Sequence, residues 1–333
     1  MKKRTIVRVV SILLSFAFTA ACGNPATTAT RTTAQNTLAE VPNTGPKGLP
    51  LYDPQGFCFD PQGNLYVADR NIDKEQYRVI KLSPTGQVLT EWHLFKRTYN
   101  IGSNGPTGVA CDRQGNIYVA DTSENRILWL SPAGKLLAKW GSQGDQPGQF
   151  DGFTSLALDP QGNLFVSEYN NHRIEKFSPT GKLLAVLAKP YGNDPDELEG
   201  PIDLGIGAQG DIYVVDQRNN RIMHLSSNGK FIGMWGQLGS NPGQFNQPGG
   251  MAIDKQGNIY IADDNNNRIQ KFTPTGTLLA VWGNPIKNVV HFNQGPGPLV
   301  LSPEGLIYTT DTGPNDTIWH IIKISPSGKL LGP

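Results

Sequence analysis

The sequence has little of what catalytic and nucleic-acid-binding proteins usually need. Its Lys and Arg residues (29) nearly balance its Asp and Glu residues (28), so the net charge of +1 gives no sign of a nucleic-acid partner. No Gly-x-Ser-x-Gly or His-Glu-x-x-His motif is present. Five histidines occur without metal-ligand spacing: His93, His172, His224, His291 and His320. The sequence therefore contains no recognisable enzyme motif.

Residues 1–21 have the composition of an export signal. Positive charge at residues 2–4 precedes an apolar run from Ile6 to Phe18, which is too short to span a membrane in the mature protein. The end of the signal resembles the lipobox of bacterial lipoproteins, with Cys22 as the lipid-attached residue, although Thr19 stands where Leu is usual. Ordinary secretion, with Cys22 as an incidental residue, is the alternative.

Residues 22–50 read as a lipid-attached flexible linker. From residue 23 to about 47 they are rich in Thr, Ala, Asn and Pro, with Leu38 and Val41 as the only large aliphatic side chains, and so cannot bury enough apolar surface to fold. We expect an exported protein anchored to the cell envelope only by its lipid. Because Gly23 and not Asp follows the cysteine, the outer membrane is the expected site in a bacterium with two membranes.

Glycine and proline are abundant, at 38 and 25 residues, and the glycines recur at fixed positions. Each repeat consists of an apolar strand, a Gly turn and an aromatic strand, followed by an acidic residue. The turn glycines are spaced by 47 to 52 residues: Gly63, Gly115, Gly162, Gly210, Gly257 and Gly305. This period suits a blade of four antiparallel strands. It predicts an all-β, six-bladed β-propeller over residues 51–333, with repeats at about 51–97, 98–145, 146–192, 193–240, 241–288 and 289–333.

The repeats also resemble a known family. The segments 140–150 and 235–245, each Trp-Gly through Pro-Gly-Gln-Phe, and the run Val-Ala-Asp-Thr-Ser-Glu-Asn-Arg-Ile ending at Ile127 look like the NHL repeat. The resemblance covers essentially the whole exported domain and implies a six-bladed β-propeller. Since a closed propeller exposes no long free strand edge, we expect a monomer.

Two sets of repeated residues are predicted to be structural. One is a ring of strand-end acids that can pair with an Arg five residues later in four repeats and lie too far apart to share one ion: Asp69, Asp121, Glu168, Asp216, Asp263 and Asp311. The other is a set of Trp residues at the ends of outer strands, which we expect to pack between blades: Trp92, Trp140, Trp235 and Trp282.

Departures from the repeat are better candidates for function. Asp203 is an acid at the predicted channel mouth, where the equivalent residues are small or apolar, and Asp53 also lies there, one residue before its proline. They are candidate ligands for Ca²⁺ or another divalent ion in the channel, and solvated loop acids are the alternative. We expect no other cofactor.

Two four-residue insertions define the predicted binding face. From the acid that ends the second strand to the Arg or His of the third strand, the chain advances nine residues in repeats 1 and 6 and five residues in the other four. Repeats 1 and 6 become neighbours when the ring closes. Together with the basic aromatic connection at residues 93–99, the insertions present four candidate anchors: Tyr77, Arg97, Tyr99 and Trp319. Alternatively, the insertions support the seam, where residues 38–41 could complete the last blade.

Two functions follow from this pattern. The first is a recognition or scaffold module that binds a protein, peptide or glycan through its loop face. The second is a metal-dependent enzyme similar to NHL-type amidating lyases or gluconolactonase-like hydrolases, whose channel needs a convergent set of His or acidic ligands. Cys58 and Cys111 lie on adjacent inner strands, where a disulfide could form, but we expect two free buried thiols.

Overall fold

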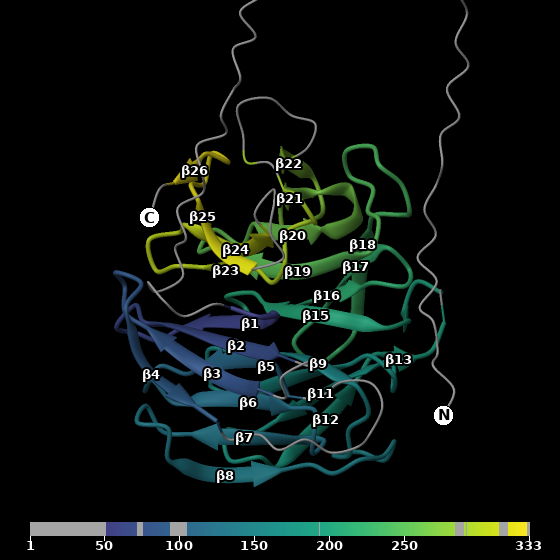
Figure 1. Cartoon of the computed structure of the whole chain (residues 1–333). Helices are drawn as coiled ribbons and strands as arrows, with labels where there is room; N and C mark the ends of the chain where they lie inside the picture. Colours follow the sequence, from purple (N-terminus) through teal and green to yellow (C-terminus); the bar gives the residue numbers. More distant parts are fainter. Residues whose placement is uncertain are drawn as a thin grey trace, which may run out of the picture. The chain divides into compact units, whose positions relative to one another are not determined.

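The computed structural model describes residues 51–331 apart from 72–75, 94–104, 193, 284–289, 291 and 313–318. In this part of the chain the strands form six four-stranded antiparallel sheets, each with its strands in sequence order. The innermost strands surround a common axis and the outermost strands lie at the periphery (Figure 1). The predicted all-β, six-bladed β-propeller is therefore confirmed.

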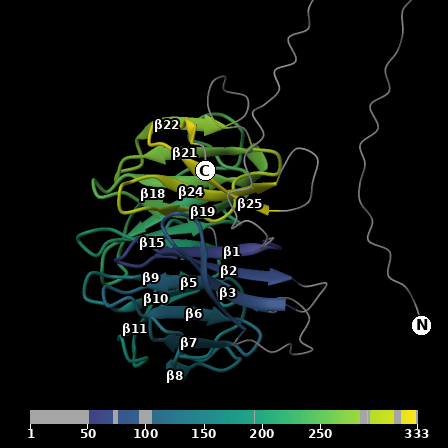
Figure 2. The same cartoon turned by 60° about the vertical axis from the view of Figure 1, so that its left-hand side comes forward.

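The blades, from inner to outer strand, are β1 (Pro54–Phe59), β2 (Leu65–Asn71), β3 (Gln76–Leu82) and β4 (Val88–Trp92); β5 (Pro106–Cys111), β6 (Ile117–Asp121), β7 (Arg126–Leu130) and β8 (Leu136–Trp140); β9 (Phe153–Leu158), β10 (Leu164–Glu168), β11 (Arg173–Phe177) and β12 (Leu183–Leu187); β15 (Pro201–Ile206), β16 (Ile212–Asp216), β17 (Arg221–Leu225) and β18 (Phe231–Trp235); β19 (Pro248–Ile253), β20 (Ile259–Asp263), β21 (Arg268–Phe272) and β22 (Leu278–Gly283); and β23 (Val300–Leu301), β24 (Ile307–Thr312), β25 (Trp319–Ile324) and β26 (Leu330–Leu331). A short parallel pair, β13 (Lys189–Pro190) and β14 (Glu197–Leu198), joins blades 3 and 4, and a 3₁₀ turn, η1 (Asp264–Asn266), follows β20. Blades 2 and 5 lie at opposite ends of the assembly, with β8 and β22 outermost (Figure 2).

The turn between the first and second strands is fixed by its own aspartate. In blade 1, Asp60 Oδ1 accepts hydrogen bonds from the N–H groups of Gln62 (3.0 Å) and Asn64 (2.8 Å). The same bonds recur at Asp112, Asp159 and Asp254. Gly63 has a φ of 78°, a left-handed conformation that glycine adopts without steric cost. The repeated Asp and Gly are therefore needed to close the hairpin.

The core consists of apolar clusters between neighbouring blades. At the outer edge, the Trp that ends one blade covers the turn glycine of the next blade, where no side chain would fit. This contact joins Trp92 to Gly134, Trp140 to Gly181, Trp235 to Gly276 and Trp282 to Gly328. The predicted packing of these Trp residues between blades is confirmed, and each blade needs its neighbour to bury its aromatic face.

The ring closes between blades 6 and 1. The inner strands β1 and β23 are neighbours, and Leu51 forms an isolated antiparallel bridge with Trp319. An apolar cluster that includes Leu51, Phe57 and Ile321 fills this seam, with Trp319 packed against it. Residues 38–41, the other proposed support for the seam, lie outside the described residues.

Cys58 of β1 and Cys111 of β5 form a disulfide, with their Cα atoms 5.7 Å apart. The expectation of two free thiols is therefore wrong. The inner strands approach one another closely: a Cβ placed on Gly56 would lie 3.0 Å from the Cα of Gly108. Cys58 and Cys111 occupy positions of opposite alternation on their two strands. Because these strands converge near the axis, the two cysteines still come within disulfide range. Within the described part of the chain, no helix is long and apolar enough to cross a membrane.

Candidate recognition surface and axial cavity

The strand-end acids are held in buried ion pairs. In blades 1 to 5 each acid accepts a bond from the Arg opposite it on the third strand, at N–O distances of 2.7–2.8 Å: Asp69–Arg78, Asp121–Arg126, Glu168–Arg173, Asp216–Arg221 and Asp263–Arg268. The five carboxylates are fully buried. In blade 6, Asp311 instead accepts the backbone N–H of Asn293 at 3.0 Å. The structural role predicted for these acids is confirmed for the five Arg-paired blades.

These Arg residues also hold the connections between blades. Arg173 donates to the carbonyl oxygens of Gln146 (3.0 Å) and Gln149 (2.8 Å), and Arg268 makes the equivalent bonds to Asn241 and Gln244. Burial raises the pKa of the carboxyl groups of Asp69, Asp121, Glu168 and Asp216, against the opposing effect of their Arg partners. The acids thus stabilise the connections on the predicted binding face, and their carboxylate oxygens have few lone pairs left for a ligand.

Asp203 lies near the axis and joins three blades. Its Oδ1 accepts bonds from Ser155 Oγ of blade 3 (2.5 Å) and from its neighbour Leu204 N (2.8 Å), and its Oδ2 accepts Met251 N of blade 5 (2.6 Å). Burial raises the pKa of Asp203 to about 6, although these hydrogen bonds oppose the shift. Asp203 is therefore a bridge between inner strands that titrates close to neutral pH.

The structure does not bring Asp53 and Asp203 together as metal ligands. Asp53 Oδ2 is paired with Arg70 Nε at 2.7 Å, and Asp53 Oδ1 accepts Gln55 Nε2 at 2.6 Å. Among the described residues, no group of three or more His, Cys, Asp or Glu side chains could hold a metal ion. Both oxygens of each acid are already used by protein donors, so the donor set in this part of the chain does not fit a channel ion.

The predicted anchors on the insertions are placed differently from our expectation. The insertion in blade 1 extends the β2–β3 hairpin, with Arg70 opposite Tyr77, and Tyr77 is only 3% exposed because its ring packs against Gly105. Trp319 is half-buried in the seam between blades 6 and 1. Tyr77 therefore packs inside the protein, and Trp319 packs against the seam with part of its side chain exposed. Arg97 and Tyr99 lie outside the described residues.

A different group of side chains, two of them exposed and two half-buried, lies on the predicted face. We call it the Tyr191 cluster, and it consists of Tyr169, His172, Tyr191 and Arg218. Arg218 Cζ lies 4.7 Å above the ring of Tyr169, and its Nε donates to the Tyr169 hydroxyl at 3.1 Å. The rings of His172 and Tyr191 meet edge to face at 5.0 Å. Tyr191 is 69% exposed.

The backbone of Gly200 holds the Tyr191 cluster together. Its N–H donates to His172 Nδ1 at 3.0 Å, and a Cβ at this position would collide with Tyr169 and approach Arg218. Burial and the charge of Arg218 lower the pKa of His172, so the neutral ring can accept this bond. Sequence reasoning missed the cluster, although Tyr169 could have signalled it: the equivalent residues are Arg70, Thr122, Gln217, Asp264 and Thr312.

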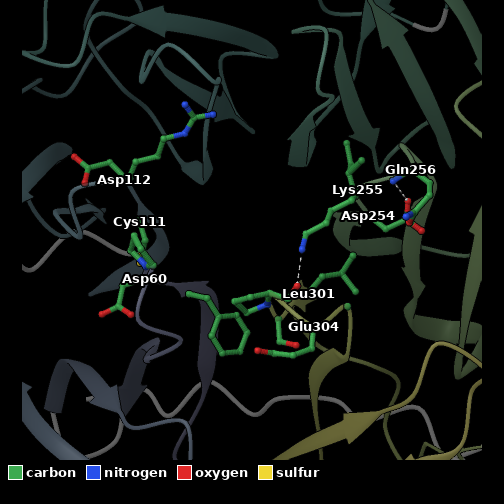
Figure 3. A pocket seen from close by; sticks show the side chains of 15 residues that line it. Asp60, Cys111, Asp112, Asp254, Lys255, Gln256, Leu301 and Glu304 are labelled. Atoms are coloured by element: carbon green, nitrogen blue, oxygen red, sulfur yellow. Dashed lines mark hydrogen bonds between the residues drawn. The ribbon is translucent and has the colours of Figure 1, made fainter.

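A cavity of about 480 Å³ lies at the other end of the inner strands. It is lined by the turns that follow β1, β5, β19 and β23, so it opens on the face opposite to the predicted binding face. Figure 3 shows Asp60, Cys111 and Asp112 on one side and Asp254, Lys255 and Gln256 on the other, with Leu301 and Glu304 between them. The sequence did not indicate this cavity, because its lining comes from four blades that are far apart in the chain.

Comparison with known proteins agrees with this architecture. The family model of the NHL repeat matches residues 104–130 and 245–272. The chain is a six-bladed β-propeller with matches to the NHL repeat in blades 2 and 5. A curated relative, the peptidylglycine alpha-amidating monooxygenase of Rattus norvegicus, is 32% identical over 126 residues. That match covers 34% of this chain and only 12% of the relative.

Several solved structures share the fold of this propeller. A streptogramin B lyase has a TM-score of 0.60 at 17% identity, covering 85% of this chain and 83% of that one. The virginiamycin B lyase from Staphylococcus aureus has a TM-score of 0.60 at 15% identity, covering 85% and 86%. A putative gluconolactonase has a TM-score of 0.58 at 17% identity, covering 85% and 91%. At these identities the likeness establishes the fold alone.

Proposed function

We propose that this propeller is a recognition module that binds a protein, peptide or glycan partner on the face formed by the second-to-third-strand loops and the blade connections. The Tyr191 cluster is the observation that carries the proposal. Tyr and Arg are the side chains most often found at the energetic centres of interfaces. Here they stand on the predicted face, at the boundary of blades 3 and 4.

The cluster is suited to binding because its polar groups are already oriented. Stacking on Tyr169 fixes the plane of Arg218, whose side chain remains 43% exposed, so a partner would order it at little entropic cost. The backbone of Tyr191 is also held in a left-handed conformation, with a φ of 56°. Bulky residues adopt this conformation at a cost of about 1–3 kcal/mol, and such residues concentrate at functional sites.

The proposal includes export and lipid attachment at Cys22. The charged, apolar and small segments of residues 1–22 support it, as does the composition of residues 23–47. Replacing Cys22 with Ser should release the protein from the membrane fraction or block its processing. Equal membrane association of Cys22→Ser and the parent chain would contradict the lipid anchor.

A metal-dependent lyase or lactonase-like hydrolase is the second candidate, favoured by the activities named for the similar structures. Asp203, with its pKa of about 6, is the acid in the described channel that titrates near neutral pH. However, its two oxygens are already bonded to Ser155, Leu204 and Met251. The site therefore supports recognition better, and metal analysis of the purified domain would test the enzyme directly.

Site-specific photo-crosslinking in intact cells tests the recognition proposal. A photoreactive phenylalanine analogue placed at position 191 should form a discrete adduct with a partner. The same probe at Val186, which is exposed on the outer strand β12, is the matched control and should form none. Adducts of equal yield at both positions, or none at position 191, would count against the proposal.

A further inference from the structure

The axial cavity on the opposite face has a feature that the repeat does not explain. The residue after the turn aspartate or its equivalent is Pro or Ala in four blades, at Pro61, Pro160, Ala208 and Pro303. In the other two blades it is basic, Arg113 in blade 2 and Lys255 in blade 5. Because these two blades are opposite one another, the two cations reach the cavity from opposite sides.

The three aspartates that line the cavity already accept hydrogen bonds from the protein. Asp112 accepts the N–H groups of Gln114 (2.9 Å) and Asn116 (2.8 Å). Asp60 and Asp254 make the same turn bonds and are also paired with Lys81 at 3.3 Å and Lys271 at 3.1 Å. Their carboxylates turn away from the centre of the cavity (Figure 3). For Asp60, the hydrogen bonds from Asn64 and the charge of Lys81 outweigh burial and lower its pKa.

The basic side chains are not neutralised in the same way. Lys255 Nζ donates to the carbonyl oxygen of Pro303 in the neighbouring blade 6 at 2.8 Å, and no ion pair joins Lys255 to another described residue (Figure 3). Arg113 is exposed, and no hydrogen bond or ion pair joins it to another residue in the described chain. The remaining acid, Glu304, has its pKa lowered by a hydrogen bond from Ser302, with further effects of Lys323 and Lys255.

Part of the wall of the cavity is apolar. Phe59, Ile253 and Leu301 each end an inner strand and are half-buried, which leaves part of each side chain facing the cavity. Cys111 of the disulfide lies beside them. The volume lies within the range of roughly 300–1,000 Å³ that is usual for small-molecule sites. An apolar wall with basic groups at its rim suits an amphipathic anion.

We infer that this cavity binds a small organic anion, whose carboxylate or sulfonate is bound by Arg113 and whose apolar body rests on Phe59, Ile253 and Leu301, while Lys255 adds positive charge from the opposite side. The planar guanidinium of Arg113 can bind both oxygens of a carboxylate at once. This site is separate from the recognition face, so binding here does not depend on the proposed function.

Calorimetry with sodium octanoate tests the site on the purified propeller. Arg113→Ala should weaken octanoate binding by about tenfold, the usual size of a charge-assisted hydrogen bond. Lys255→Ala should weaken it less, and 1-octanol should bind more weakly than octanoate because it lacks the charge. Lys182→Ala removes an exposed cation from blade 3 and should leave binding unchanged.

Either of two binding results would overturn the inference, as would one crystallographic result. One is failure of the parent protein to bind octanoate at millimolar concentration. The other is equal affinity of the parent and the Arg113→Ala, Lys255→Ala double variant. A crystal structure with octanoate should show the carboxylate beside Arg113, and density elsewhere would also refute the site.

Discussion

The connection into blade 3 (residues 141–150) and the connection into blade 5 (residues 236–245) share one design but rest on different side chains. Both end in Pro-Gly-Gln-Phe, and both bury that Phe completely. Both are held by the Arg that begins the third strand of the blade. Below this Arg, on the same strand, blade 3 has Glu175 where blade 5 has Gln270.

The two side chains make the same first contact but differ in the second. Glu175 Oε1 accepts Gly148 N at 3.0 Å, and Gln270 Oε1 accepts Gly243 N at 2.8 Å. The amide of Gln270 then donates to Gln244 O (2.7 Å) and to Asp263 (3.0 Å). A carboxylate cannot donate, so Glu175 can imitate Gln270 only when it carries a proton.

The surroundings of Glu175 favour that proton. Burial is the main cause that raises the pKa of Glu175 to about 7, and the negative charge of Glu168 on β10 adds to it. The Gly148 hydrogen bond and the charge of Arg173 act in the opposite direction. Val186 faces it from β12, and Asp145 is the acid of the connection above. The repeat thus sets the geometry of both connections, while single departures such as Glu175 decide how each connection responds to pH.

The largest predicted effect comes from breaking the part that both connections share. Arg268→Ala would leave Asp263 buried without its partner, which should lower the free energy of unfolding by about 3–5 kcal/mol. Arg70→Ala removes an Arg whose acid, Asp53, is 32% exposed, and should cost at most about 1 kcal/mol. Urea unfolding of both variants measures the difference. Similar losses in the two would mean that the buried pairs do not secure the connections.

The next effect concerns the disulfide, a departure that stabilises the ring. Cys58→Ala with Cys111→Ala should lower the free energy of unfolding by about 2–4 kcal/mol, because the unfolded chain loses a crosslink between residues 53 apart. The purified parent should show no free thiol at positions 58 and 111 when it is unfolded without a reductant. Two titratable thiols would contradict the disulfide.

A smaller, pH-dependent effect separates the two connections directly. The pKa of Glu175 rises from its ordinary value of 4.5 to about 7 on folding, so the folded protein holds this proton more tightly than the unfolded chain. The contribution of Glu175 to the free energy of unfolding should therefore fall as pH rises from about 4.5 to about 7, by an amount on the order of 1–3 kcal/mol.

Glu175→Gln should remove that contribution and stabilise the protein at pH 8, whereas Gln270→Glu should introduce a similar pH dependence in blade 5. Thermal unfolding of the two variants and the parent between pH 4 and pH 8 provides the measurement. A pH dependence that is unchanged by Glu175→Gln would mean that the pKa of Glu175 does not shift on folding.

The sequence predicted what each repeat contains but not what several repeats form together. The regular spacing of Gly63 and its equivalents predicted the blades. The short spacing between each strand-end acid and the following Arg predicted their pairing. The Cys58–Cys111 bond, the cavity beside Arg113 and the Tyr191 cluster all depend on contacts between residues of different blades. Such contacts depend on how closely the inner strands approach and how the connections fold, and neither appears as a local pattern in the sequence.

The central claim is that recognition depends on the departures at the Tyr191 cluster and not on the repeated acids. Photo-crosslinking from position 170, next to Tyr169, tests it in the Tyr191→Ala, Arg218→Ala double variant. Our account predicts that the partner adduct disappears while the melting temperature stays close to that of the parent, since both side chains are exposed. An adduct that persists at full yield in this folded variant would contradict the account.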